Sequence, residues 1–165
     1  MSILIIKYHF ILTNYQLKYI LSIDSVKMEV INIFLSYISK KREVVAFLDE
    51  LHKLLCSDDF DINTNLNFIR KNKHGDEQKF STPYTLLDLD YDTEDVVKKL
   101  KELTVEEYSE TKIDKDDVNP PILFVFGKDL NCRLIYVKLK IRNSQKQVVC
   151  VSFHYAKDKM EFPYA

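Results

Sequence analysis

The stretch that decides the fold runs from Leu134 to His154 and reads L-I-Y-V-K-L-K-I-R, N-S-Q-K-Q, V-V-C-V-S-F-H. Two runs in which apolar and polar residues alternate flank a short polar loop. This pattern predicts an antiparallel β-hairpin, because successive side chains of a strand point to opposite faces. One face of the hairpin is therefore expected to be core, and the other to carry polar side chains.

The register of this hairpin follows from placing both apolar sets on one side, since a slip of one residue would separate them. The predicted apolar pairs are Val137–Phe153, Leu139–Val151 and Ile141–Val149, and the predicted polar pairs are Tyr136–His154, Lys138–Ser152 and Lys140–Cys150. Directly opposed side chains lie about 5 Å apart at Cβ. The opposite face is thus expected to gather a Tyr, a His, a Ser, two Lys and an Arg in one compact patch.

The chain has 165 residues, of which 46% are hydrophobic, and this composition predicts one globular domain with a real core. We place that domain at residues 41–165 and regard residues 1–40 as an N-terminal extension of uncertain role. Three interpretations of the extension stay open. It is an extra strand or helix, an oligomerisation arm, or a product of translation from an upstream start, with Met28 nearer the true beginning.

Charge is distributed unevenly although the net charge is only −1. Residues 88–117 hold twelve acidic residues and five lysines, a net charge of −7, whereas residues 124–165 hold eight basic and three acidic residues, a net charge of +5. This asymmetry favours a polyanion site in the C-terminal part. The alternative is that acidic and basic surfaces simply alternate on a soluble protein.

The three cysteines and four histidines show no spacing typical of a metal site, so we expect no metal and no cofactor. Unpaired cysteines suit a reducing cytosol. The apolar start of the chain is interrupted by Lys7 and His9 and lacks the features of a signal peptide, and no apolar run is long enough to cross a bilayer. We therefore expect a cytoplasmic protein that has no membrane partner.

Before the hairpin, helical and extended segments alternate. Apolar residues at helical spacing predict a helix over residues 41–55, capped by Ser39. A strand is expected at residues 65–70, followed by a polar turn around Gly75 whose lysines could contact phosphate but are more often solvated. One helical turn is expected at residues 85–89. A helix capped by Thr93 is then expected to end near Leu103.

A short capped turn at residues 104–107, carrying Tyr108, and a polar connection at residues 114–121 lead to a buried strand, I-L-F-V-F, at residues 122–126. Gly127 and the N-C pair at residues 131–132 are expected to form the turn into the hairpin, and the tail to lie over the sheet. This order predicts an α+β fold, with helices packed on one face of an antiparallel sheet. The other face stays open and carries the polar side of the hairpin.

The residue types of this polar face suit RNA cleavage without a metal. Such cleavage needs a base for the ribose 2′-OH, an acid for the leaving 5′-oxygen, and cations for the phosphorane. His154 titrates near neutrality, and neighbouring cations could strengthen Tyr136 as an acid. The remaining roles fall to three cations that bind phosphate and a hydroxyl that donates a hydrogen bond, namely Lys138, Lys140, Arg142 and Ser152. From pattern alone, an ordinary solvated or binding face is the more frequent explanation.

Five segments of the C-terminal part also carry a resemblance. The sequences E-E-Y-S-E, L-F-V-F-G-K, I-Y-V-K-L-K-I, V-V-C-V-S-F-H and M-E-F-P-Y resemble, in this order and spacing, the MqsR-type toxins of bacterial type II toxin–antitoxin systems. Those toxins belong to the wider RelE-like group of endoribonucleases. The resemblance runs from about Lys41 to the end and leaves out the first forty residues.

The resemblance implies a RelE-like fold and a cytosolic mRNA interferase. Such a protein cleaves single-stranded mRNA without a metal, arrests growth, and is held inactive by a cognate antitoxin, in a toxin–antitoxin hetero-oligomer. It implies catalytic roles for Tyr136, Lys138 and His154. Lys128 and Tyr108 are peripheral candidates, for phosphate contact and base stacking respectively.

This chain departs from the better-known branch of the family at several positions. That branch has Lys where this chain has His154, a Tyr-Lys pair close to Ser109 and Glu110, and a Gln near the strand at Phe124. The alternative function is therefore a non-catalytic module of the same fold that binds RNA or protein through the same face.

Overall fold

The computed structural model describes residues 36–117 and 121–165. Residues 37–165 form one compact unit, which begins close to the predicted domain boundary. Its helices are α3 (Lys41–Leu55), α4 (Ile62–Asn65), α5 (Thr82–Leu89) and α6 (Thr93–Lys101). Its strands are β1 (Ser36–Tyr37), β2 (Leu66–Phe68), β3 (Tyr108–Ile113), β4 (Ile122–Leu130), β5 (Arg133–Arg142) and β6 (Gln147–Tyr155). Three short 3₁₀ segments are η1 (Gly75–Phe80), η2 (Val105–Glu107) and η3 (Asn143–Gln145).

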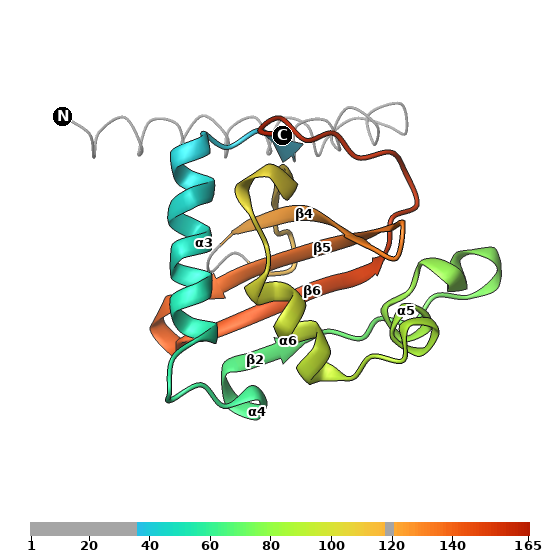
Figure 1. The fold of residues 1–165 in the computed structure, drawn as a ribbon, viewed down its shortest axis with the longest axis horizontal. Coiled ribbons are helices and arrows are strands. Elements are labelled where there is room, and N and C mark those ends of the chain that lie inside the picture. Colours follow the sequence, from blue (N-terminus) through green and yellow to red (C-terminus); the bar gives the residue numbers. More distant parts are fainter. Residues whose placement is uncertain (1–35, 118–120) are drawn as a thin grey trace, which may run out of the picture. The chain divides into compact units, whose positions relative to one another are not determined.

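The strands of the described residues form one six-stranded sheet in the order β1-β3-β4-β5-β6-β2 (Figure 1). Strands β3 to β6 pair antiparallel in sequence order, and β2 pairs with β6 in parallel. The predicted α+β class is confirmed. The prediction of a purely antiparallel sheet is wrong, because the short strand β2 returns along the outer side of β6.

Helices α3 and α6 cross one face of this sheet (Figure 1). The apolar stripe of α3 is buried against the strands, and each such side chain contributes about 1.5–3 kcal/mol to stability. The predicted helix over residues 41–55 is confirmed, but its predicted cap is wrong. The N–H of Lys40 donates to the Glu43 carboxylate (3.0 Å), whereas Ser39 is buried and its Oγ lies 2.8 Å from Oγ1 of Thr111. The cap of α6 is likewise Asp92 rather than Thr93.

The register of the hairpin is confirmed for half of its length. Tyr136–His154, Val137–Phe153 and Lys138–Ser152 are paired as predicted. A β-bulge then shifts the register by one residue, and Leu139, Lys140 and Ile141 pair with Cys150, Val149 and Val148. The predicted pairs in this half are therefore wrong. The bulge turns Cys150 into the core, where burial raises the pKa of its thiol to about 12.

Strand β3 is absent from the predicted elements, although the capped turn before it is present as η2. The predicted turn between β4 and β5 is confirmed at the N-C pair and wrong at Gly127. Gly127 lies inside β4, and the turn is made by Asn131 and Cys132, whose φ angles are 55° and 62°. Two successive left-handed residues match the right-handed twist of a tight hairpin.

Helix α5 lies at the edge of β6, beyond the end of β2 (Figure 1). It is longer than predicted and begins at Thr82. The hydroxyl groups of Thr82 and Thr85 accept hydrogen bonds from the backbone N–H groups of Phe153 (3.5 Å) and Tyr155 (3.1 Å). These two bonds satisfy donors of the β6 edge that the short strand β2 leaves uncovered.

The C-terminal tail packs on the sheet as predicted. A Cβ placed on Gly127 would lie 2.7 Å from Cζ of Phe162, so the absence of a side chain at Gly127 makes room for this ring. Because Gly127 is paired with Tyr136, the Phe162 ring lies on the same face as the predicted polar patch. Tyr164 instead stacks on Tyr108, with ring centroids 5.7 Å apart.

No helix of the described residues is long and apolar enough to cross a membrane. The three interpretations of residues 1–40 lie almost wholly outside the described part of the chain.

Candidate active site

Tyr136 and His154 lie side by side on the face of the sheet opposite α3 and α6. They are a directly opposed pair of β5 and β6, and their rings stack with centroids 5.2 Å apart and an interplanar angle of 13°. Lys138 and Ser152 form the next polar pair along the same strands. We call the surface made by Lys112, Tyr136, Lys138, Ser152 and His154 the Tyr136 patch.

The imidazole of His154 is held in one orientation. Its Nδ1 lies 2.9 Å from the backbone oxygen of Tyr155, and because a carbonyl only accepts, Nδ1 carries the proton of this bond. Burial lowers the pKa of His154 below its ordinary value; the bond to Tyr155 opposes this shift, and the charges of Lys73 and Lys138 add to it. A neutral ring with Nδ1–H presents a lone pair at Nε2, which is the form that a general base requires.

Tyr136 is shifted in the direction opposite to the one predicted. Burial raises the pKa of its phenol, and although the charge of Lys112 acts to lower it, burial prevails. The phenol is therefore protonated at neutral pH and can donate a proton or a hydrogen bond. The prediction that neighbouring cations make Tyr136 a stronger acid is wrong in its net effect.

Lys138 is a half-buried cation of the patch. In the described part of the chain it forms no ion pair; the charges of Asp114 and Asp116 reach it only from a distance. Burial lowers its pKa, and the charges of Lys112 and Lys71 lower it further. A cation surrounded by other cations is stabilised by an incoming anion, which suits a phosphate ligand.

Lys112 belongs to the site and was missing from the predicted residues. It lies on β3, and its Nζ is 5.9 Å from the centroid of the Tyr136 ring and 2.9 Å from a carboxylate oxygen of Glu110. The sequence hides it because the stretch Y-S-E-T-K-I alternates weakly and does not indicate a strand. Two lysines of the predicted polar turn after β2 also lie near the site: the charge of Lys71 lowers the pKa of Lys138, and that of Lys73 lowers the pKa of His154.

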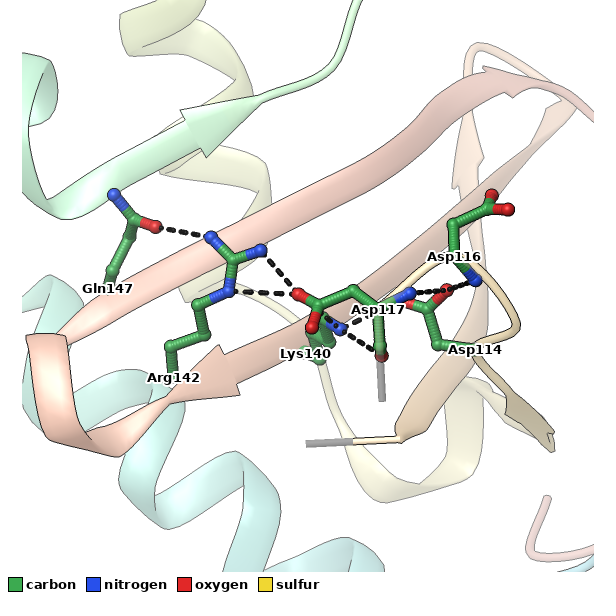
Figure 2. Close-up of polar contacts among 6 residues, drawn as sticks. All are labelled: Asp114, Asp116, Asp117, Lys140, Arg142 and Gln147. Carbon is green, nitrogen blue, oxygen red and sulfur yellow. Dashed lines mark hydrogen bonds and ion pairs between the residues drawn. The ribbon is translucent and has the colours of Figure 1, made fainter. Parts of the chain in front are cut away.

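The other two predicted cations of β5 are engaged elsewhere. Lys140 is 1% exposed, and its Nζ lies 2.7 Å from Oδ2 of Asp114 and 3.0 Å from Oδ2 of Asp117. The guanidinium of Arg142 pairs with the Asp117 carboxylate and donates to Oε1 of Gln147 (3.1 Å), as Figure 2 shows. We call these five residues the Asp117 cluster. Neither cation is placed for the predicted phosphate contact.

A hydrogen-bonded turn holds the two aspartates of the Asp117 cluster in place. One oxygen of Asp114 accepts from the backbone N–H groups of Asp116 (3.0 Å) and Asp117 (3.2 Å) (Figure 2). This turn holds the segment after β3 against the half of β5 that carries Lys140 and Arg142. The segment therefore brings negative charge to positions where the sequence predicts a basic surface.

Lys128 and Tyr108 lie away from the Tyr136 patch. Lys128 is on the helix-covered face of β4, where its Nζ lies 3.0 Å from the Glu107 carboxylate and donates to the backbone oxygen of Glu102 (3.0 Å). Tyr108 has no exposed surface, and its hydroxyl lies 2.7 Å from Oγ1 of Thr111. Neither placement fits the predicted contact, because Lys128 is paired with acids and the Tyr108 ring is part of the core.

The predicted charge asymmetry is partly cancelled in space. Four of the eight basic residues after position 124 form ion pairs with acids of residues 88–117; they are Lys128, Arg133, Lys140 and Arg142. Lys138 forms no such ion pair in the described residues, so the positive charge left on the polar face of β5 lies in the Tyr136 patch.

No group of three or more His, Cys, Asp or Glu side chains that could hold a metal ion occurs in residues 36–117 and 121–165. That the chemistry needs no metal stays a prediction.

Comparison with known proteins finds no matching family model, no matching curated protein and no matching solved structure.

Proposed function

We propose that this protein is an endoribonuclease that cleaves single-stranded RNA by attack of the ribose 2′-OH, without a metal. One observation carries the proposal: an oriented, neutral histidine stacks on a protonated tyrosine, beside a cation that has no ion-pair partner in the described residues. A base, an acid and a phosphate ligand are the three groups that this reaction needs.

Each proton transfer in the proposed reaction has a named donor and acceptor. Nε2 of His154 takes the proton of the 2′-OH, and the 2′-oxygen attacks the adjacent phosphorus. Tyr136 gives its phenolic proton to the leaving 5′-oxygen, and Lys138 stabilises the added negative charge of the phosphorane. The products are a 2′,3′-cyclic phosphate and a 5′-OH. Return of the proton from His154 to the Tyr136 phenolate, across the stacked pair, restores the site.

The resemblance to MqsR-type toxins gives this activity a biological setting. Under the proposal the fold is RelE-like, the substrate is mRNA, and cleavage inhibits translation and growth in the cytoplasm. A cognate antitoxin neutralises the protein in a hetero-oligomer. The helix-covered sheet with its polar opposite face supports this assignment.

The direct test is cleavage of a fluorescent single-stranded RNA by the purified protein in the presence of EDTA. We expect cutting, with cyclic phosphate and 5′-OH ends, and no cutting of the same oligonucleotide with 2′-O-methyl riboses. The mechanism would be contradicted if cutting required magnesium, or if the 2′-O-methyl oligonucleotide were cut as well as the RNA.

A matched pair of histidine variants assigns the base. His154→Gln is expected to lower the cleavage rate at least ~100-fold, the lower end of the range for loss of a general base. His52→Gln is the control, because His52 lies on α3 away from the Tyr136 patch. Equal rates in the two variants would remove His154 from the mechanism.

The second candidate function is RNA or protein binding without cleavage. The specific observation in its favour is that the Asp117 cluster withdraws two of the three basic residues that β5 carries on the polar face. Expression in bacteria separates the two functions, since an active toxin arrests growth when it is expressed alone and a binding module does not. Relief of that arrest by a small protein encoded beside it would identify the antitoxin.

A further inference from the structure

Two neighbouring groups bound the Tyr136 patch. The ring of Phe162 lies over Gly127, the β4 partner of Tyr136, and therefore covers β4 beside Tyr136. Along β5, Lys140, whose side chain is only 2% exposed, is held by Asp114 in the Asp117 cluster. A polyanion that ran along β5 past Lys138 would therefore meet carboxylates, and one that ran along β4 would meet the Phe162 ring.

Across the strands, in contrast, cations lie on both sides of the Tyr136–His154 pair. On the β3 side is Lys112, whose side chain is 38% exposed and whose Nζ lies 2.9 Å from a Glu110 carboxylate oxygen and 5.9 Å from the centroid of the Tyr136 ring. On the β6 side are Lys71, which is exposed, and Lys73, whose side chain is 35% exposed. Lys138 lies between these two groups. Lys112 and Lys73 each form an ion pair, with Glu110 and Glu77, but both pairs are partly exposed and worth about 0–1 kcal/mol, so a phosphate can compete for these lysines. The lysines thus form a band that crosses the strands.

The position of the Lys71–Lys73 segment follows from the parallel pairing of β2. Phe68 is opposite Cys150, and the N–H of Ile69 donates to the backbone oxygen of Cys150 (2.9 Å). Because the two strands run in the same direction, the chain after Ile69 continues alongside the part of β6 that carries Ser152 and His154. The ion pair between Glu77 and Lys157 (2.6 Å) fixes the following segment near the end of β6.

We propose that single-stranded RNA crosses the sheet from the β3 side to the β6 side, with Lys112 and Lys71 binding phosphates on opposite sides of the scissile one. Lys73 adds charge on the Lys71 side. The inference rests on the proposed function for the position of the scissile phosphate. It assigns Lys71 and Lys112 as substrate-binding residues and excludes Lys140 and Arg142 from the substrate path.

The span of this path sets a minimum substrate length. Three strand spacings of about 4.8 Å separate β3 from β6, a distance of roughly 14 Å. Phosphates of one stacked strand are spaced about 3.4 Å apart along the helix axis, so the span covers at most roughly four phosphate steps. RNAs of two or three nucleotides are therefore expected to be poor substrates, and the cleavage rate to level off at roughly five to six nucleotides.

The salt dependence of RNA binding tests the path. The probe is a fluorescein-labelled eight-nucleotide RNA, bound to the His154→Gln protein so that cutting is at least ~100-fold slower, and the readout is anisotropy at several salt concentrations. Each lost phosphate contact is expected to lower the slope of log K against log salt by about 0.7 for a single strand. We expect this loss for Lys71→Gln and for Lys112→Gln, and restoration of the slope by Lys112→Arg.

Two controls use cations outside the path. Arg142→Gln lies on the same face of β5, and Lys53→Gln lies on the exposed side of α3; both are expected to leave the slope unchanged. A slope that falls with Arg142→Gln but not with Lys71→Gln or Lys112→Gln would overturn the proposal and place the RNA along β5.

Failure of the path and failure of the proposed function are distinguishable. If the wild-type protein binds the RNA with the expected slopes but does not cut it, the path stands and the endonuclease proposal fails. If it cuts RNA while the slopes of Lys71→Gln and Lys112→Gln match that of the parent, the path fails and the endonuclease proposal stands. Absence of any RNA binding would overturn both.

Discussion

Two halves of one strand face, Tyr136–Lys138 and Lys140–Arg142 of β5, have similar sequences and different environments. Both halves alternate with core residues and point away from α3 and α6. The first half lies against His154 and Ser152, and its lysine has no ion-pair partner in the described residues. The second half lies under the segment after β3, whose aspartates pair with both of its cations. The acids that come from elsewhere in the chain, rather than the strand's own pattern, decide which half can receive an anion.

The largest expected effect tests whether the second half serves stability. Lys140→Ala removes a buried cation and leaves the Asp114 carboxylate, which is 11% exposed, without its 2.7 Å partner. Breaking a buried pair in this way costs about 3–5 kcal/mol of unfolding free energy. Lys138→Ala, two residues away on the same face, is expected to cost less than about 1 kcal/mol.

Urea denaturation of both variants measures this difference. The double variant Lys140→Met with Asp114→Asn is the control. Replacing both charges leaves none uncompensated and restores much of the loss, and the Asn side-chain oxygen can still accept from the backbone N–H groups of the turn. Equal losses for Lys138→Ala and Lys140→Ala would mean that the two halves do not differ in the way described.

The next effect tests whether the first half serves catalysis. Tyr136→Phe keeps the ring that stacks on His154 and removes only the hydroxyl, so the fold is expected to be unchanged. The cleavage rate should fall on the order of 100-fold if the phenol is the general acid. An RNA with a 5′-thio leaving group, which needs no protonation, should be cut by the variant and by the wild-type protein at similar rates. A 100-fold difference on that substrate would assign Tyr136 to binding instead.

A smaller effect concerns pH. The folded-state pKa of His154 lies below its unfolded value because of burial, so the unfolded chain takes up a proton first as the pH falls. Stability is therefore expected to decrease below about pH 6.5, and down to the folded-state pKa. His154→Gln should flatten the pH dependence of the unfolding free energy in this window, whereas Arg142→Gln should leave it as in the wild-type protein. An unchanged dependence in His154→Gln would show that His154 titrates normally in the folded state.

The sequence was sufficient to bring together Tyr136, Lys138, Ser152 and His154, because alternation fixes the face of a regular strand. It could not locate the β-bulge, since the run V-V-C-V is apolar at both parities and fits either register. The α+β class and the helix at residues 41–55 were likewise predictable from periodicity. The contribution of Lys112 and the loss of Lys140 were not, because both depend on the segment around β3. The sequence of that segment is typical of a polar connection. Its contact with β5, between Asp114 and Lys140, joins residues 26 positions apart.

The smallest expected effect asks whether the second half can be made to resemble the first. Asp117→Asn removes the carboxylate that pairs with Arg142 and leaves Asp114 to hold Lys140. The guanidinium then becomes available to an anion at the border of the Tyr136 patch. RNA binding by the Asp117→Asn protein should gain about one phosphate contact, a slope steeper by about 0.7 in log K against log salt. Combining it with Arg142→Gln should abolish the gain, since the added contact would come from that side chain. A gain that survives Arg142→Gln would mean that the loss of negative charge acts on the patch as a whole. In that case the Asp117 cluster would lower RNA affinity through its negative charge at a distance, and not through its ion pair with Arg142.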